Sequence, residues 1–193
     1  ELAAENQDFP IGAGDWLRIH PKDRVKTSYT SWECNQSTRR MPEFMAPGLG
    51  KQNNRVFMDI EIGDNANGVL YALGGASGGI TVYLQDGYLT YLYNMLIIEQ
   101  YKLTTDEPIA AGKHQIEVET KIPGPGKSGT VVIKVDGKGV GTLELKRTVP
   151  GVFTASETFD VGVDLGSTVS LNYADLRPFE FQGKINKMNV DLK

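Results

Sequence analysis

The two-residue turn Asp86-Gly87 constrains the fold most, because it lies between two runs of alternating apolar residues. An Asp-Gly pair is typical of a type I′ turn, in which both central residues adopt positive φ angles. The turn predicts a hairpin within residues 68–94, with Gln85 opposite Tyr88. Because side chains alternate across a strand, one face of this hairpin is apolar and is predicted to be core. That face contains Ile80, Val82, Leu84, Leu89, Tyr91 and Tyr93.

The opposite face of the hairpin is mixed in character and is compatible with contact to solvent. It contains Thr81, Tyr83, Gln85, Tyr88, Thr90 and Leu92. Tyr83 and Tyr88 are therefore candidates for exposed aromatic residues.

The same strand pattern recurs along the chain, and no segment keeps helical periodicity for three turns. Asp136-Gly137 predicts a second tight hairpin, residues 95–103 are expected to form one strand, and the spacing between Ile185 and Met188 predicts a bulge. Many short strands with these turn signals favour an all-β, two-sheet antiparallel sandwich.

We expect the 193 residues to form a single domain. Residues 1–54 would supply an N-terminal strand, around Trp16 to Ile19, and a long connection. Residues 55–193 would form the regular sandwich.

Composition excludes several classes of function. The formal net charge is −4 and no Lys/Arg cluster offsets it, which argues against a nucleic-acid partner. No apolar run approaches the roughly 20 residues of a membrane helix, so no membrane partner is expected. The single Cys34 excludes an internal disulfide framework and any multi-cysteine metal site.

Catalysis is not indicated by any pair of side chains. Only His20 and His114 are available as imidazole bases, and neither has a serine or cysteine at a spacing that selects it as a nucleophile. Cys34 is interpreted as a plain thiol. We therefore expect this chain by itself not to be an enzyme.

Several collinear motifs resemble the C-terminal region of large bacterial arylsulfatases, over roughly residues 38–192. They include RMPEFMAPGLG, DGYLTYLYN and ETFDVGVDLGS. The resemblance implies a concanavalin A-like or laminin G-like jelly roll that lies behind a sulfatase catalytic domain. The catalytic signature of that family, Cys or Ser followed by x-Pro-x-Arg, is missing here, since Asn35 and Gln36 follow Cys34.

The resemblance therefore implies a non-catalytic accessory domain that packs on a sulfatase catalytic domain or shapes access to it. Its location would be periplasmic or secreted if the parent enzyme is exported. The alternative is a carbohydrate-binding module that recognises a polysaccharide. A docking domain should present a broad apolar patch with polar edges, whereas a glycan module should present a groove with aromatic rings and hydrogen-bond donors.

Candidate binding residues follow from these two readings. Aromatic side chains for stacking on a sugar are Trp16, Trp32, Tyr83 and Tyr88. Arginines for bidentate contact with a sulfate are Arg39, Arg40 and Arg177. Contacts inside the fold, a domain interface or a solvated loop explain the same residues equally well.

Asp160 and Asp164 are the candidate ligands for a structural Ca²⁺, because hard cations prefer several oxygen ligands from one region. In an extended strand the two residues would lie about 13 Å apart. Gly162 and Gly166 would have to turn the backbone to bring them together. The competing interpretation is that both are ordinary turn carboxylates, and no other cofactor is expected.

Overall fold

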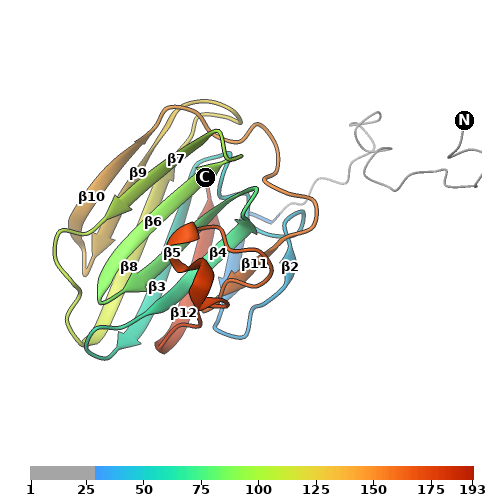
Figure 1. Ribbon diagram of the computed structural model, residues 1–193. Helices are drawn as coiled ribbons and strands as arrows, with labels where there is room; N and C mark the ends of the chain where they lie inside the picture. The colour runs from blue at the N-terminus through green and yellow to red at the C-terminus, as the bar shows by residue number, and fades with distance from the viewer. Residues whose placement is uncertain (1–28) are drawn as a thin grey trace, which may run out of the picture.

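The computed structural model describes residues 29–193, which form two six-stranded antiparallel sheets packed face to face (Figure 1). Sheet A contains, in spatial order, β1 (Ser31–Cys34), β12 (Gly183–Leu192), β3 (Asn54–Ile62), β8 (Gly112–Lys121), β9 (Gly129–Val135) and β10 (Lys138–Leu145). Sheet B contains β2 (Met41–Pro42), β11 (Thr158–Val161), β4 (Gly68–Gly75), β5 (Gly78–Gln85), β6 (Tyr88–Met95) and β7 (Glu99–Thr104). One short 3₁₀ helix, η2 (Leu171–Leu176), precedes β12. Within residues 29–193, no helix is long and apolar enough to cross a membrane.

The predicted hairpin of β5 and β6 is confirmed in both turn and register. Gln85 pairs with Tyr88 and Ile80 pairs with Tyr93, while Asp86 and Gly87 have φ angles of 51° and 83°. The second Asp-Gly turn is confirmed by the pairing of Val135 with Lys138. The bulge before Met188 is also confirmed, because the register with β3 shifts between Ile185 and Lys187.

The main core lies between the two sheets. All six residues of the predicted apolar face of the hairpin are at most 1% exposed. They pack against inward-facing residues of sheet A such as Val56, Met58 and Ile116. Burying one such aliphatic side chain contributes about 1.5–3 kcal/mol, so this layer supplies most of the hydrophobic stabilisation.

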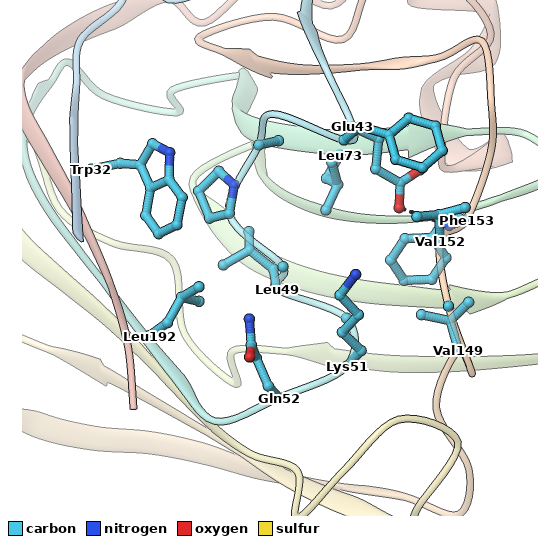
Figure 2. A pocket seen from close by; sticks show the side chains of 16 residues that line it. Trp32, Glu43, Leu49, Lys51, Gln52, Leu73, Val149, Val152, Phe153 and Leu192 are labelled. Atoms are coloured by element: carbon cyan, nitrogen blue, oxygen red, sulfur yellow. Dashed lines mark hydrogen bonds between the residues drawn. The ribbon is translucent and has the colours of Figure 1, made fainter. Parts of the chain in front are cut away.

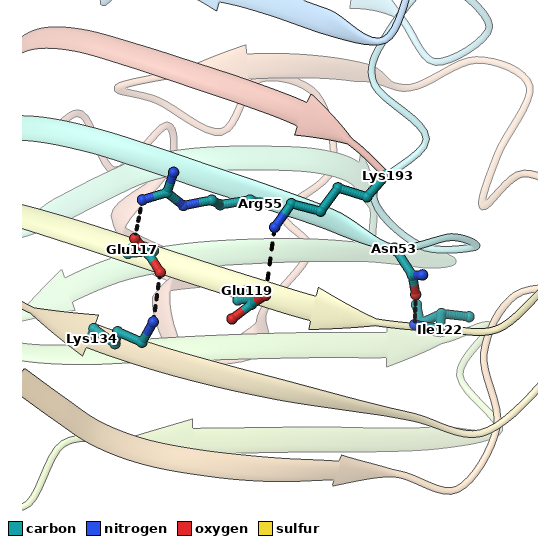
Figure 3. Close-up of polar contacts among 7 residues, drawn as sticks. All are labelled: Asn53, Arg55, Glu117, Glu119, Ile122, Lys134 and Lys193. Atoms are coloured by element: carbon teal, nitrogen blue, oxygen red, sulfur yellow. Dashed lines mark hydrogen bonds and ion pairs between the residues drawn. The ribbon is translucent and has the colours of Figure 1, made fainter. Parts of the chain in front are cut away.

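The outer face of sheet A carries ion pairs between neighbouring strands. Glu117 on β8 accepts hydrogen bonds from Arg55 on β3 and from Lys134 on β9, so three neighbouring strands are linked (Figure 3). Lys193 approaches Glu119 to 3.6 Å in the same view. Opposite charges placed across strands stabilise the sheet modestly and keep this face polar.

The outer face of sheet B differs from the expectation. It is covered at β4 and β5 by residues 162–181, which we call the cover segment, and Figure 1 shows its helical turn in front of these strands. The segment closes a second apolar cluster, which contains Val69, Ala72, Tyr83, Leu92, Val169, Tyr173 and Phe179. Leu92, Thr81 and Thr90 are consequently buried, and only part of this face is open to solvent.

Two strand boundaries also differ from the expectation. Residues 95–103 do not form one strand, because Leu96 and Ile97 adopt positive φ angles of 53° and 65° and make a turn between β6 and β7. The expected connection over residues 31–54 contains the short strands β1 and β2. The strand expected around Trp16 lies outside the described residues.

Candidate functional site

A recess opens at the end of the sandwich, between the loop over residues 43–52 and the connection over residues 149–153. It has a volume of about 90 Å³. Its walls come from five parts of the chain: Trp32 on β1, the loop over residues 43–52, Leu73 on β4, the connection over residues 149–153, and Leu192 at the end of β12. Segments distant in the sequence therefore meet at one place.

Aromatic side chains form opposite walls of this recess. Figure 2 shows Trp32 on one side and Phe153 on the other. Trp32 is half-buried and packs on the core, while Phe44 at the rim is 52% exposed. The close approach of the two loops requires glycine at position 50, because a Cβ there would lie 2.5 Å from Cζ of Phe153.

Tyr93 on β6 holds the two loops together beneath the recess. Its hydroxyl donates to the carbonyl of Gly50 at 2.7 Å and accepts from the backbone N–H of Val149 at 2.8 Å. Burial and the neighbouring Tyr101 and Glu43 raise the pKa of this phenol, so it stays protonated and keeps both bonds. The recess is thus built on a rigid strand.

Polar groups line the floor and edge of the recess. Glu43 accepts from the backbone N–H groups of Phe153 at 2.7 Å and Thr154 at 2.9 Å. Burial raises the pKa of the Glu43 carboxyl, although these two bonds and Lys51 partly oppose the shift. The side chains of Lys51 and Gln52 lie between the aromatic walls (Figure 2).

The size of the recess limits what it can accept. Because one water occupies about 30 Å³, a volume of about 90 Å³ suits a methyl, acetyl or hydroxymethyl group and not a whole sugar ring. Trp32 and Phe44 beside it offer ring faces or edges for the rest of a ligand. The arrangement therefore suits an amphipathic ligand that inserts one substituent and lies across the rim.

The loop over residues 43–52 was expected to be only a connection. Pro47, Gly48 and Gly50 are residue types that interrupt regular secondary structure. The same residues make a compact loop whose Leu49 is buried and whose Gly50 contacts Phe153. The density of Pro and Gly was the available signal, but nothing local indicated the partner of this loop.

The other predicted aromatic residues that the structure describes do not line the recess. Tyr83 is buried, because Tyr173 lies edge-on against its ring at 4.9 Å and Asn172 donates to its hydroxyl at 2.9 Å. The expectation that Tyr83 is exposed is therefore wrong. Tyr88 is 39% exposed at the start of β6, and Trp16 lies outside the part of the chain that the structure describes.

The predicted arginines do not line the recess. Arg39 forms an ion pair with Glu180 at 2.7 Å, which ties the loop before β2 to the end of the cover segment. Arg40 is exposed, with a φ angle of 57°, and its backbone N–H donates to Asp160. Arg177 is exposed three residues before Glu180. A sulfate contact by these three residues stays a prediction.

Asp160 and Asp164 lie on opposite sides of a backbone turn at Gly162, whose φ angle is 76°. Both carboxylates are buried. Asp160 accepts from the backbone N–H of Arg40 at 2.6 Å and from the Thr158 hydroxyl at 2.7 Å. Among the residues that the structure describes, no group of three or more His, Cys, Asp or Glu is placed to hold a metal ion.

We propose that these two carboxylates are internal hydrogen-bond acceptors, and we expect Ca²⁺ to leave the thermal midpoint unchanged. Thermal melts in millimolar Ca²⁺ and in excess chelator test this. A site filled at a hundred times its Kd would add about 2.7 kcal/mol, which corresponds to a midpoint shift of about 5–10 °C for a domain of this size. A shift of that size would establish a calcium site.

Two of the three groups considered for catalysis, Cys34 and His114, are engaged elsewhere, and His20 lies outside the described residues. Cys34 is buried, and burial raises the pKa of its thiol, which disfavours the nucleophilic thiolate. His114 lies with Nδ1 2.8 Å from Asp136 and Nε2 2.9 Å from the carbonyl oxygen of Ala110. Neither geometry presents an activated nucleophile.

Comparisons with known proteins identify the architecture. No protein-family profile matches the sequence, and no curated protein matches it. The sialidase carbohydrate-binding module CBM40 of Ruminococcus gnavus, bound to α2,3-sialyllactose, has a similar structure, with a TM-score of 0.57 and 13% identity over 86% of this chain and 91% of that one. The LG4-5 domains of mouse laminin α1 give a TM-score of 0.58 and 14% identity, over 88% of this chain and 45% of that one.

A further similar structure is the binding domain of botulinum neurotoxin serotype D, with a TM-score of 0.53 and 12% identity over 88% of this chain and 41% of that one. At such identities the likeness concerns the fold alone. The chain therefore has a jelly-roll fold of the laminin G-like and concanavalin A-like kind, as expected. Two of these neighbours are described as binding domains, the sialidase CBM40 and the neurotoxin domain.

Proposed function

We propose that this chain is a non-catalytic glycan-binding domain whose site is the recess beside Trp32. The observation that carries the proposal is the pairing of aromatic walls with polar side chains at one recess of about 90 Å³. This is the arrangement expected of a glycan module, in which a ring face stacks on the sugar and polar groups fix its orientation. The carbohydrate-binding module among the structural neighbours supports this choice of ligand class.

Replacing Trp32 by alanine should weaken glycan binding at least tenfold, because it removes one aromatic wall of the recess. The measurement begins with an array of neutral, sialylated and sulfated oligosaccharides, followed by calorimetric titration of the best binder. Tyr88→Ala is the matched control, since Tyr88 is also a partly exposed aromatic residue but does not line the recess. A tenfold change in Kd corresponds to about 1.4 kcal/mol.

Two results would contradict the proposal. One is the absence of any binder on the array for the folded wild-type protein. The other is a glycan whose affinity is unchanged by Trp32→Ala.

A second candidate function is the accessory role implied by the resemblance to arylsulfatases, in which the domain packs on a catalytic domain. Exposed apolar side chains at the loop end of the sandwich favour it. Phe44 and Met45 are 52% and 67% exposed in the loop after β2, and Ile97 and Ile98 are 69% and 64% exposed in the β6–β7 turn. Such side chains are typical of surfaces that a partner covers.

The reading frame upstream of Glu1 discriminates the two candidates. A Cys/Ser-x-Pro-x-Arg segment encoded there would favour the accessory role. A frame without this segment would favour an independent binding protein.

A further inference from the structure

The cover segment is held over sheet B by backbone bonds at its two ends and by side chains in its middle. At the ends, Gly162 N–H donates to Leu70 O and Val69 N–H donates to Phe179 O, both at 2.9 Å. In the middle of the segment, residues 165–176, Ser167 donates to Glu157 and Asn172 donates to the Tyr83 hydroxyl. Further contacts are made to Asp164, which is a buried acid, so its protonation state affects the stability of this middle part.

Asp164 links separate residues of the cover segment to one another and, through Tyr173, to sheet B. Its Oδ2 accepts from the backbone N–H of Val169 at 2.9 Å and from the hydroxyl of Tyr173 at 2.6 Å. The Tyr173 oxygen also lies 3.0 Å from the hydroxyl of Thr81 on β5. Tyr173 in turn packs on Tyr83, so Asp164 is linked through Tyr173 to the second apolar cluster.

The same carboxyl is poorly suited to carry a charge. Asp164 is 1% exposed, and its Oδ1 is buried without a hydrogen-bond partner among the described residues. The charged groups that act on it are Asp160, on β11, and Glu157, just before that strand, and both are acidic. Burial is the main reason why the pKa of the Asp164 carboxyl is raised to about 6, and the two neighbouring acids contribute less. The hydrogen bonds from Tyr173 and Val169 oppose this shift.

We propose that Asp164 is a proton-operated latch, which closes residues 165–176 over the outer face of sheet B when it is protonated and loosens them when it is ionised. Opening would expose the ring of Tyr83 and the hydroxyl of Thr81. The proton comes from solvent and no other reactant is required. The latch is independent of the recess beside Trp32.

The direction of the pH effect follows from linkage. The pKa of Asp164 is higher in the closed form, about 6, than its ordinary value of 3.8, so the closed form binds the proton more tightly. Its stabilisation is complete below about pH 4 and is lost as the pH rises through about 6. Between pH 4 and pH 7.5 the opening equilibrium should increase about 50-fold, because each pKa unit corresponds to a factor of ten.

Hydrogen exchange of the Val169 amide reports this opening directly, because that amide donates to Asp164. Protection is measured at pH 4 and pH 7.5 and corrected for the intrinsic exchange rate at each pH, with amides of β3 as an internal reference. The wild type should lose protection about 50-fold at the higher pH. Asp164→Asn, which resembles the protonated acid, should keep high protection at both values.

Asp175→Asn is the matched control, because Asp175 is an exposed acid on η2 in the same segment, and it should behave as the wild type. Tyr173→Phe is a second variant in case Asp164→Asn does not fold. Since the Tyr173 hydroxyl favours the ionised form of Asp164, its loss should enlarge the difference in Val169 protection between pH 4 and pH 7.5. Protection of Val169 that does not depend on pH in the wild type, or a dependence that persists in Asp164→Asn, would overturn the proposal.

Discussion

Replacing Gly68 by alanine should destabilise the domain by about 4 kcal/mol or more, which is a large part of the 5–15 kcal/mol typical of a folded domain. Gly68 begins β4 with a φ angle of 114°, which L residues rarely adopt. A Cβ at this position would lie 2.6 Å from the backbone N of Phe181 and would overlap the neighbouring Glu180 carbonyl. Because both obstacles are backbone atoms, no side-chain rotation relieves them.

Urea unfolding of Gly68→Ala and Gly63→Ala measures this effect against a matched control. Gly63 also lies at a strand connection, but no atom lies within 4 Å of a Cβ built there. Gly63→Ala should therefore change the free energy of unfolding by less than about 0.5 kcal/mol. A loss below about 1 kcal/mol in Gly68→Ala would show that the cover segment can move away from β4 easily.

Replacing Tyr93 by phenylalanine should cost about 2–4 kcal/mol and also impair the recess. The substitution removes one oxygen and leaves two backbone groups, the Gly50 carbonyl and the Val149 N–H, without their buried partner. An unsatisfied buried polar group costs about 1–3 kcal/mol. Since these groups belong to the two loops that wall the recess, we expect both loops to loosen and glycan affinity to fall.

Tyr88→Phe controls for the chemical change itself, because Tyr88 is 39% exposed and water can solvate its hydroxyl. Its free energy of unfolding should stay within about 0.5 kcal/mol of the wild type. Urea unfolding and titration with the best glycan are measured on both variants. If Tyr93→Phe were as stable as Tyr88→Phe, the two loops would not depend on the Tyr93 hydroxyl.

Local features of the sequence were sufficient to predict the hairpin of β5 and β6. The Asp86-Gly87 turn is specified by two adjacent residues, and the pairing of Ile80 with Tyr93 then follows from alternation along the strands. The bulge before Met188 could be predicted for the same reason, since a break in alternation is visible within a few residues. Period-two patterns carry this information because each strand has one buried face.

The cover segment could not be predicted from the hairpin that it covers. Tyr83 and Leu92 alternate with core residues in the way that residues facing solvent do, and their burial depends on Tyr173 and Phe179, which come 81 to 96 positions later in the chain. Asp164 was considered as a calcium ligand or as an ordinary turn carboxylate, whereas its lack of a partner at Oδ1 is a property of the packed structure. Contacts between remote segments leave no periodic signal in either segment.

The candidate site illustrates the same division between local and tertiary information. Trp32 was identified from the sequence because an aromatic residue in an irregular part of a β domain is a reasonable ligand contact. Leu192 reaches it through the pairing of β1 with β12, and Gly50 and Phe153 come from two further regions of the chain. Residue types and local turns thus determined the two Asp-Gly hairpins and the register of β5 with β6, whereas the recess and the latch exist only through long-range packing, because each needs groups that local rules place independently.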